Sequence, residues 1–178
     1  MTFGEFMKFL ALCGYPAQGS ALAGGGVAGL KSPGVLAQSA VPASVTGTAV
    51  ETTLASIVIP AGALKANGSL RVTTLWSYPN NANTKTAKTY FGGIAFSNKA
   101  LTTSLSNQMQ TIVRNRGVTN SQVSSAPTAA SDYGSSGAVV QAAAIDTTQA
   151  QTLLITGTLA TIADTLTLEA YTVEILNP

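Results

Sequence analysis

Hydrophobic and polar residues alternate along the chain from residue 51 onward, and this alternation predicts β-strands. The clearest stretch is SLRVTTLWSY, in which Leu70, Val72, Trp76 and Tyr78 share one face of an extended strand. The stretch ETTLASIVIP has the same period. We therefore expect one face of each strand to be buried. The positions expected to be buried include Ala55, Ile57, Leu70, Val72 and Trp76.

Further strand-like stretches follow at intervals of about 10–14 residues, the spacing typical of a sandwich or jelly roll. They are KTAKTYFGGIAF, QMQTIVRNRG, AVVQAAAID, AQTLLITGTLA and DTLTLEAYTVEIL. Gly92–Gly93 interrupts the first of them, which indicates a bulge or a bend. The last one shifts its apolar face near Ala170–Tyr171, which indicates a bulge or a strand buried on both sides.

Turn residues separate these strands. Asn67–Gly68 is a strong signal for a hairpin or a turn, and residues 117–137 predict a long loop with room for one short strand. Together the patterns predict an all-β fold, an antiparallel β-sandwich of jelly-roll type with seven or eight strands and no long helix. We expect this domain to span residues 50–178 and to follow an extended N-terminal arm.

Residues 1–49 differ in character and predict an anchoring arm. Phe3, Phe6, Leu10 and Cys13 recur at spacings of three and four, which fits one face of a short amphipathic helix. A helix of this length is not stable alone in water, so it needs a partner surface. Residues 14–49 are rich in Gly, Ala, Ser and Pro without a sustained period, as in a tether. The large apolar groups expected to anchor the arm are Phe3, Phe6, Phe9, Leu10 and Tyr15.

The glycine-rich stretch ALAGGGVAGLKSP within this arm resembles a phosphate-binding loop only in part. Such a loop requires Lys directly after its last Gly, and here Leu30 separates Gly29 from Lys31. It also requires a strand before and a helix after, whereas Pro33 stops a helix at once. The stretch is therefore interpreted as part of the tether.

Charged residues make up only 9% of the chain, against about 25% in an average soluble protein. The surface must then be covered by Ser, Thr, Asn and Gln, as in exported proteins or in subunits that pack against neighbours. The net charge of +2 is too small to indicate a nucleic acid or an anionic membrane as a partner. We expect the small basic clusters TKTAKTY and VRNRG to be solvated strand ends or loops.

A single cysteine leaves no pair for a disulfide, and no apolar run approaches the roughly 18 residues of a membrane span. The start, MTFGEFMKFLALCG, resembles a signal peptide faintly. Its apolar stretch is short, Glu5 interrupts it, and the bulky Leu12 stands where a small residue should precede cleavage. We do not expect this segment to direct secretion.

The chain contains no histidine, which removes the common Ser-His-Asp and Cys-His sites and His-ligated metals. Two carboxylates from different strands could still meet, so the acids alone do not exclude a glycosidase-like site. Cys13 lies in an apolar segment without an obvious activator, which favours an idle thiol. We expect no enzyme activity, no metal and no cofactor.

A specific order of turns and strands covers residues 52 to about 96. A strand ending in IPAGAL is followed by NGSLRV, a strand with Trp76, an Asn-rich loop and a strand containing YFGG. This order, with the closing strand LTLEAYTVEIL, resembles bacteriophage virion proteins of the head-decoration, head-fibre and tail-fibre type. The resemblance implies a jelly-roll fold, a structural or binding role and assembly as a homotrimer, and it implies no active-site residues.

The leading functional interpretation is a non-enzymatic phage virion protein, a capsid decoration or head-fibre subunit assembled in the host cytoplasm. Its arm would bind coat or other virion proteins. One alternative is a tail-tip protein that binds a receptor or a host glycan; the candidate stacking aromatics are Trp76, Tyr78, Tyr90 and Tyr133. Alternation favours a core or subunit-interface position for Trp76 instead, and we assign Tyr78, Tyr90 and Phe91 to the same class. A bacterial surface or pilus-like subunit is a third alternative.

Overall fold

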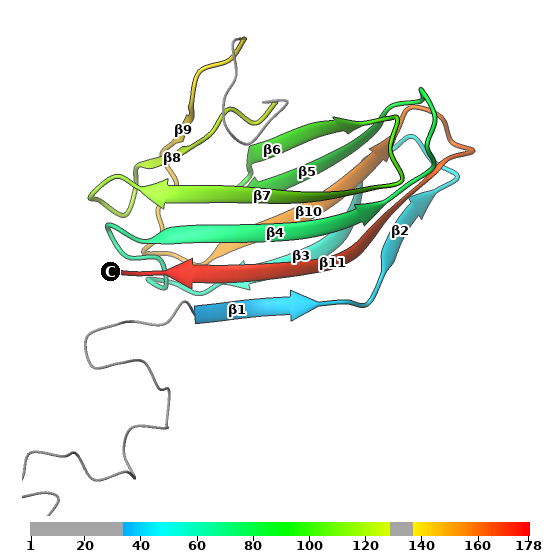
Figure 1. Ribbon diagram of the computed structural model, residues 1–178. Helices are drawn as coiled ribbons and strands as arrows, with labels where there is room; N and C mark the ends of the chain where they lie inside the picture. Colours follow the sequence, from blue (N-terminus) through cyan, green and yellow to red (C-terminus); the bar gives the residue numbers. More distant parts are fainter. Residues whose placement is uncertain (1–33, 129–136) are drawn as a thin grey trace, which may run out of the picture. The chain divides into compact units, whose positions relative to one another are not determined.

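The structure is a computed structural model that describes residues 34–128 and 137–178. These residues form β-strands joined by turns and loops (Figure 1). The strands are β1 (Gly34–Ser39), β2 (Ala43–Thr46), β3 (Thr52–Ile59), β4 (Ser69–Ser77), β5 (Lys85–Phe91), β6 (Ile94–Leu101), β7 (Ser106–Asn115), β8 (Gln122–Ser124), β9 (Gln141–Ala143), β10 (Gln151–Leu159) and β11 (Thr165–Leu176). The expected all-β class is confirmed.

The strands form two antiparallel sheets that pack face to face as a sandwich. The larger sheet has the order β1-β11-β4-β7-β8-β9, with β2 also paired to β11, and the smaller sheet has the order β3-β10-β5-β6. If β1 and β2 count as one bent strand and the short β8 and β9 are set aside, eight strands remain. When these eight strands are renumbered from 1 to 8 in chain order, the larger sheet has the order 1-8-3-6 and the smaller sheet has the order 2-7-4-5. This alternation between two sheets is the jelly-roll topology.

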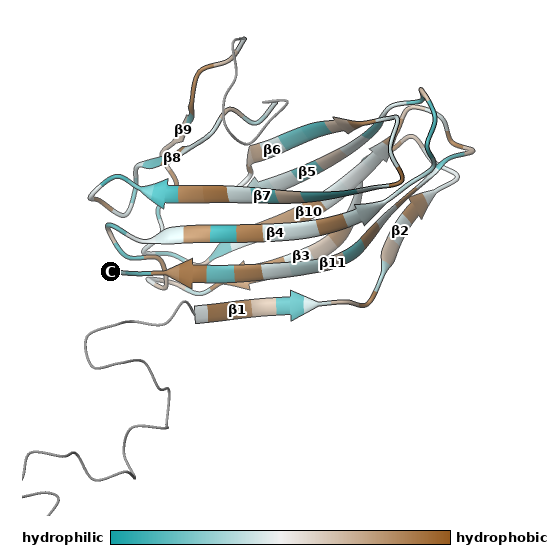
Figure 2. Cartoon of the chain, in the orientation of Figure 1, coloured by the Kyte–Doolittle hydropathy of each residue, from teal (hydrophilic) through white to brown (hydrophobic). Residues whose placement is uncertain are grey.

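The core lies between the two sheets, where the alternating apolar positions meet. Leu70, Val72 and Trp76 of the larger sheet are buried, as are Phe91 and Leu153 of the smaller sheet. Figure 2 shows apolar and polar residues alternating along these strands. Each fully buried aliphatic or aromatic side chain contributes about 1.5–3 kcal/mol, so the alternation stabilises the sandwich directly. Within the described residues, no helix has the length and apolar character to cross a membrane.

The expectation that no strand of the sandwich lies before residue 50 is wrong. Strand β1 pairs with β11 from Gly34 to Ser39, and β2 pairs with β11 from Ala43 to Thr46. Val45 is buried in the core. The compact unit therefore begins at Pro33. The part of the expected arm before this point, with Phe3, Phe6, Phe9, Leu10 and Tyr15, lies outside the described residues.

One glycine signal differs from the expectation, and the other follows one of its two expected alternatives. Gly92 and Gly93 make the tight turn between β5 and β6, not a bulge within one strand, and both have positive φ, at 55° and 80°. Positive φ at both turn positions is the preference of two-residue hairpins. Asn67–Gly68 belongs to a turn closed by the Gly68 N–H on Lys65 O, but it connects strands of different sheets and is no hairpin.

The end of the chain follows the prediction more closely. The register of β11 against β4 shifts between Leu168 and Ala170, so the expected bulge is confirmed. Strand β8 is a short strand in the described part of the long loop, as expected. The alanine-rich stretch before β10 contributes only the three residues of β9, which is less than the full strand expected there.

Candidate functional site

Four loops gather at one end of the sandwich, which we call the charged end. They comprise residues 47–51, 78–84, 102–105 and 160–164. Backbone hydrogen bonds connect them: Gly47 N–H to Ile162 O, Ala160 N–H to Thr84 O, and Tyr78 N–H to Leu105 O. The jelly-roll topology brings these four connections together although they are spread over more than half of the chain.

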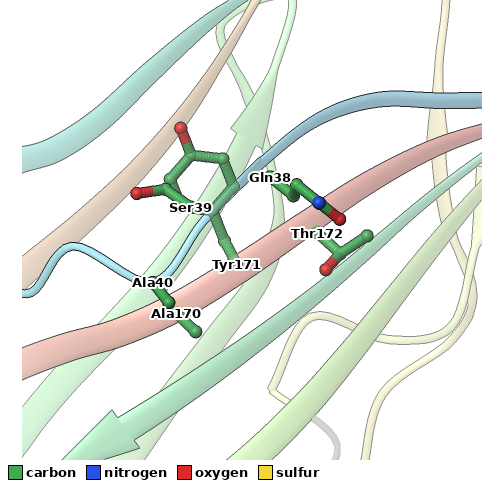
Figure 3. A pocket seen from close by; sticks show the side chains of 6 residues that line it. All are labelled: Gln38, Ser39, Ala40, Ala170, Tyr171 and Thr172. Atoms are coloured by element: carbon green, nitrogen blue, oxygen red, sulfur yellow. The ribbon is translucent and has the colours of Figure 1, made fainter.

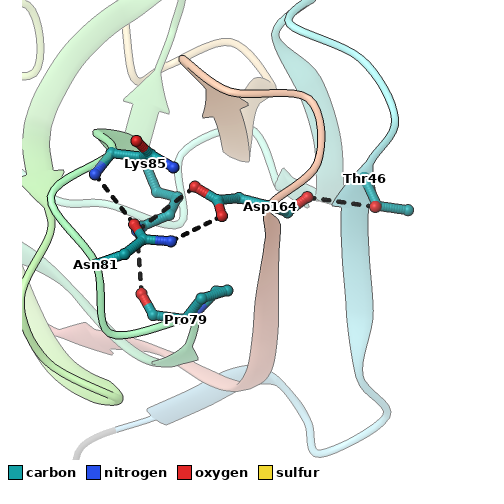
Figure 4. A network of polar contacts seen from close by, with 6 residues as sticks. Thr46, Pro79, Asn81, Lys85 and Asp164 are labelled. Atoms are coloured by element: carbon teal, nitrogen blue, oxygen red, sulfur yellow. Dashed lines mark hydrogen bonds and ion pairs between the residues drawn. The ribbon is translucent and has the colours of Figure 1, made fainter.

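A buried ionic network holds this end together (Figure 4). Lys85 is the first residue of β5 and is fully buried, although its chain neighbourhood predicted a solvated strand end. Its Nζ donates to Asn81 Oδ1 at 2.7 Å and to Pro79 O at 3.0 Å. It also lies 5.7 Å from the ring centre of Tyr78, within cation–π range. The expectation for Lys85 is therefore wrong, because the alternation of β5 turns this side chain inward with Phe91.

Asp164 completes the network from the loop between β10 and β11. Its Oδ1 accepts from Asn81 Nδ2 at 2.8 Å, and its Oδ2 lies 3.8 Å from Lys85 Nζ. The hydrogen bond from Asn81 is the main reason why the pKa of Asp164 lies below its ordinary value of 3.8. Burial opposes this shift, while Asn83 and the Lys85 charge support it. Asp164 Oδ2 is buried and has no hydrogen-bond donor.

Large apolar side chains stand exposed on three of the four loops of the charged end. They are Val50, Leu105 and Ile162, with 72%, 68% and 57% of their surface accessible. Single exposed aliphatic residues are normal, but here each comes from a different loop of one end that the buried network fixes in place. We call these three residues the apolar trio.

The outer faces of the two sheets are mostly uncharged and carry local ion pairs. On the smaller sheet, Lys88 Nζ lies 2.7 Å from Glu51 Oε2 and 3.3 Å from the hydroxyl of Tyr90, and Thr156 donates to Glu51 at 2.6 Å. On the larger sheet, Arg71 forms a two-bond pair with Glu174. These carboxylates have structural partners that hold them on the outer faces of the sheets.

A hollow of about 390 Å³ lies beside β1 and β11, where β1 ends (Figure 3). Its lining residues are Gln38, Ser39, Ala40, Ala170, Tyr171 and Thr172. The lining is neutral and contains neither a charged side chain nor a cysteine. Across residues 34–128 and 137–178, no group of three or more metal-ligating side chains comes together.

The structure places the predicted aromatic residues in two environments. Trp76, Tyr78 and Phe91 are buried, so Trp76 and Tyr78 are not available to stack on a glycan. Tyr90 is half-buried on the outer face of the smaller sheet, with Lys88 Nζ 5.8 Å from its ring centre. Tyr133 lies outside the described residues. Sequence reasoning missed Lys85, Asn81 and Asp164, although the alternation in KTAKTYF could have placed Lys85 on the buried face.

Comparison with known proteins gives distant likenesses of fold. No protein-family model and no curated protein matches the chain. The structure is similar to dimeric latent PorU from Porphyromonas gingivalis (11% identity, TM-score 0.39), covering 92% of this chain and 15% of that one. It is also similar to the VP2 subviral particle of infectious bursal disease virus (16% identity, TM-score 0.33), covering 90% and 43%. The chain thus spans less than half of each of these proteins.

Proposed function

We propose that this protein is a non-enzymatic structural subunit of a bacteriophage virion, either a capsid decoration or a head-fibre protein. In this proposal the β-sandwich forms a homotrimer on the particle surface. The N-terminal segment binds neighbouring coat subunits through Phe3, Phe6, Phe9, Leu10 and Tyr15. The order of turns and strands in residues 52–96, which resembles such virion proteins, leads to this class of function.

The observation that carries the proposal is the charged end with its apolar trio. A rigid end that presents Val50, Leu105 and Ile162 to solvent suits binding of another protein surface better than chemistry on a small molecule. The mostly uncharged sheet faces add area that can be covered by neighbours with little desolvation of charge. The hollow beside β1 is lined by neutral side chains, and none of them is a charged group that could activate the hydroxyl of Ser39.

Attachment is tested with particles made from a phage genome that lacks this gene. Full-length protein and a variant that begins at Pro33 are added to these particles, and the bound fraction is measured by sedimentation. The variant keeps β1 and β2, so it retains the whole compact unit. We expect at least tenfold weaker binding of the variant, with an unchanged thermal midpoint. Equal binding of the two proteins would disprove anchoring by residues 1–32.

The position on the particle and the subunit number are tested separately. Immunogold labelling of complete particles should decorate the head, whereas labelling confined to the tail tip would favour the receptor-binding alternative. Sedimentation equilibrium of the full chain should give a trimer at micromolar concentration. A variant with Val50→Ser, Leu105→Ser and Ile162→Ser should keep its fold and lose particle binding or trimer formation. If it keeps both, the trio is not an interface.

A further inference from the structure

We propose that Lys85 and Asn81 are joined by an intramolecular isopeptide bond, which forms with Asp164 as the catalytic acid–base. The bond would link the Lys85 amine to the Asn81 side-chain carbonyl carbon, with loss of ammonia. This inference concerns the buried network of the charged end and does not depend on the proposed virion role. The inference rests on the groups that surround the side-chain amide of Asn81. They are the Lys85 amine, the Asp164 carboxylate and a backbone N–H donor.

The nucleophile and the amide are already in contact. Lys85 Nζ lies 2.7 Å from Asn81 Oδ1, so the carbonyl carbon, one bond further on, is within reach of a small rotation of the lysine side chain. Both groups lie on one short stretch, the loop after β4 and the first residue of β5. Holding two reactants at such separations makes a reaction effectively unimolecular and removes much of its entropic barrier.

The Asn81 carbonyl oxygen is also surrounded by donors. The backbone N–H of Asn83 donates to Asn81 Oδ1 at 3.0 Å, in addition to the contact from Lys85. When an amine adds to an amide carbon, negative charge develops on this oxygen. A fixed backbone donor at this position stabilises that charge, as in an oxyanion hole.

The reaction needs two proton transfers, one from the attacking amine and one to the leaving nitrogen, and each carboxylate oxygen of Asp164 is placed for one of them. Its Oδ2 lies 3.8 Å from Lys85 Nζ and has no hydrogen-bond donor of its own, so it is placed to take a proton from the amine. Its Oδ1 accepts from Asn81 Nδ2 at 2.8 Å, so it is placed to return a proton to the nitrogen that leaves. One carboxylate thus contacts both the attacking and the departing nitrogen, which is the arrangement that general acid–base catalysis requires.

The reaction balances without any further reagent. Lys85 ammonium gives one proton to Asp164, and the neutral amine forms a bond to the Asn81 carbonyl carbon. The bond from that carbon to Nδ2 breaks after Asp164 has protonated this nitrogen, and ammonia departs. Of the two protons that Lys85 Nζ loses, one leaves on ammonia and the other remains on Asp164. The products are a secondary amide, a neutral carboxylic acid and ammonia.

The buried surroundings of Lys85 and Asp164 favour the isopeptide product over the charged amine and carboxylate. Lys85 is fully buried beside the Tyr78 ring, and Asp164 is 7% exposed. A buried charge pair has a large desolvation cost, whereas an amide and a protonated carboxyl group carry no net charge. Exclusion of water also suppresses competing hydrolysis of the amide. The small ring from Asn81 to Lys85 adds little loop-closure entropy, so removal of the charges is the main gain.

The test is the intact mass of the purified, folded full-length chain. We expect a mass lower than the sequence mass by one ammonia. Peptide mapping should show no tryptic cleavage after Lys85 and one peptide that carries the deficit between Asn81 and Lys85. A succinimide at Asn81 would lose ammonia too, but hydroxylamine cleaves it and trypsin would still cut after Lys85. The full sequence mass in the folded chain would overturn the proposal.

Variants separate the roles of the three residues. Lys85→Met and Asp164→Asn should both restore the full sequence mass, and circular dichroism checks that they fold. Lys88→Met is the matched control, because Lys88 also pairs with a carboxylate but lies on an outer sheet face, and its ammonia deficit should remain. Persistence of the deficit in Lys85→Met would contradict the proposal whatever the stability of that variant.

Discussion

At both ends of the sandwich a buried polar network holds the connecting loops together, but the two networks differ in chemistry. At the charged end, Lys85, Asn81 and Asp164 form an ionic network in which one carboxylate oxygen has no donor. At the opposite end, which we call the amide end, Gln122 and Asn115 form a neutral network. Both networks connect loops that are distant in sequence, but only one of them contains groups that can react.

The side-chain amides of Gln122 and Asn115 are saturated with hydrogen bonds, although the buried Ser124 Oγ on the same strand β8 has no partner among the described residues. Gln122 Nε2 donates to Asn115 Oδ1 at 2.8 Å and to Ile145 O at 3.0 Å, and Ile145 N–H donates to Gln122 Oε1 at 2.7 Å. Asn115 donates to Lys65 O, and Thr147 donates to Thr119 O. Because every amide atom has a partner, this network fixes the loops and leaves nothing for chemistry.

The largest effect is expected in the core beneath the charged end. Trp76→Ala removes a fully buried side chain on β4, two residues before Tyr78, and leaves Thr74 Oγ1 without the donor that it has at 2.9 Å. We expect a loss of about 3–5 kcal/mol in the free energy of unfolding, measured by chemical denaturation. Leu75→Ala is the control, because Leu75 points to the opposite face and is 39% exposed. Equal effects of the two changes would contradict the assigned faces.

The amide end should depend strongly on Gln122. Gln122→Leu keeps most of the side-chain volume but leaves the N–H and C=O of Ile145 buried without partners. Unmatched buried groups cost about 1–3 kcal/mol each, so we expect a loss of about 2–4 kcal/mol. Gln141→Leu should cost far less, because the Gln141 side chain donates to the adjacent Ala142 O at an exposed position. A small effect of Gln122→Leu would mean that water replaces the amide and that this end is not rigid.

The turn between β5 and β6 offers a matched pair of glycines at the amide end. Both have positive φ, so alanine at either position costs about 1–2 kcal/mol in backbone strain. An added Cβ at Gly92 would also meet Ile145 Cγ2 at 2.6 Å, whereas one at Gly93 would meet nothing within 4 Å. Gly92→Ala should therefore lower the thermal midpoint more than Gly93→Ala. The reverse order would contradict the packing of Ile145 against this turn.

The sequence predicts a strand well when the alternation of apolar and polar residues lies within that strand itself. Strands β4, β10 and β11 carry their own alternation, and even the bulge near Ala170 is visible in the shifted apolar face. Strands β1 and β2 have weak patterns rich in Ala, Ser and Val, and they become strands only because the twelve residues of β11 offer an edge to pair with. Such long-range pairing is invisible in a local window.

The candidate site was less predictable for the same reason. The pattern that places Lys85 inward is local, since it shares the buried face of β5 with Ala87 and Phe91. The partner Asp164 is distant in the sequence, and only the jelly-roll topology brings its loop to Asn81. The residue types alone therefore favour a solvated lysine, and the reactive arrangement emerges from the folded chain.

The smallest expected effect is a loss of stability in acid at the charged end, which the neutral network of the amide end should not show. Partial burial alone raises the pKa of Glu51, but the hydrogen bonds from Lys88, Thr156 and Tyr90 outweigh it, so the pKa lies below 4.5. Because the folded-state pKa is lower than the unfolded value, the stabilisation from Glu51 is fully present above the unfolded pKa. It is lost as the pH falls through the folded pKa. We expect no more than about 1 kcal/mol, since solvent screens this partly exposed pair.

This acid effect is measured as the thermal midpoint of the wild-type chain and of Glu51→Gln between neutral pH and pH below 4.5. The two midpoints should differ at neutral pH and converge in acid, because the protonated carboxyl group of the wild type then resembles the amide. Gln122→Leu should show no such convergence, since the groups of its network do not titrate. A constant difference between wild type and Glu51→Gln would mean that the ion pair with Lys88 does not tie the β2–β3 loop to the smaller sheet.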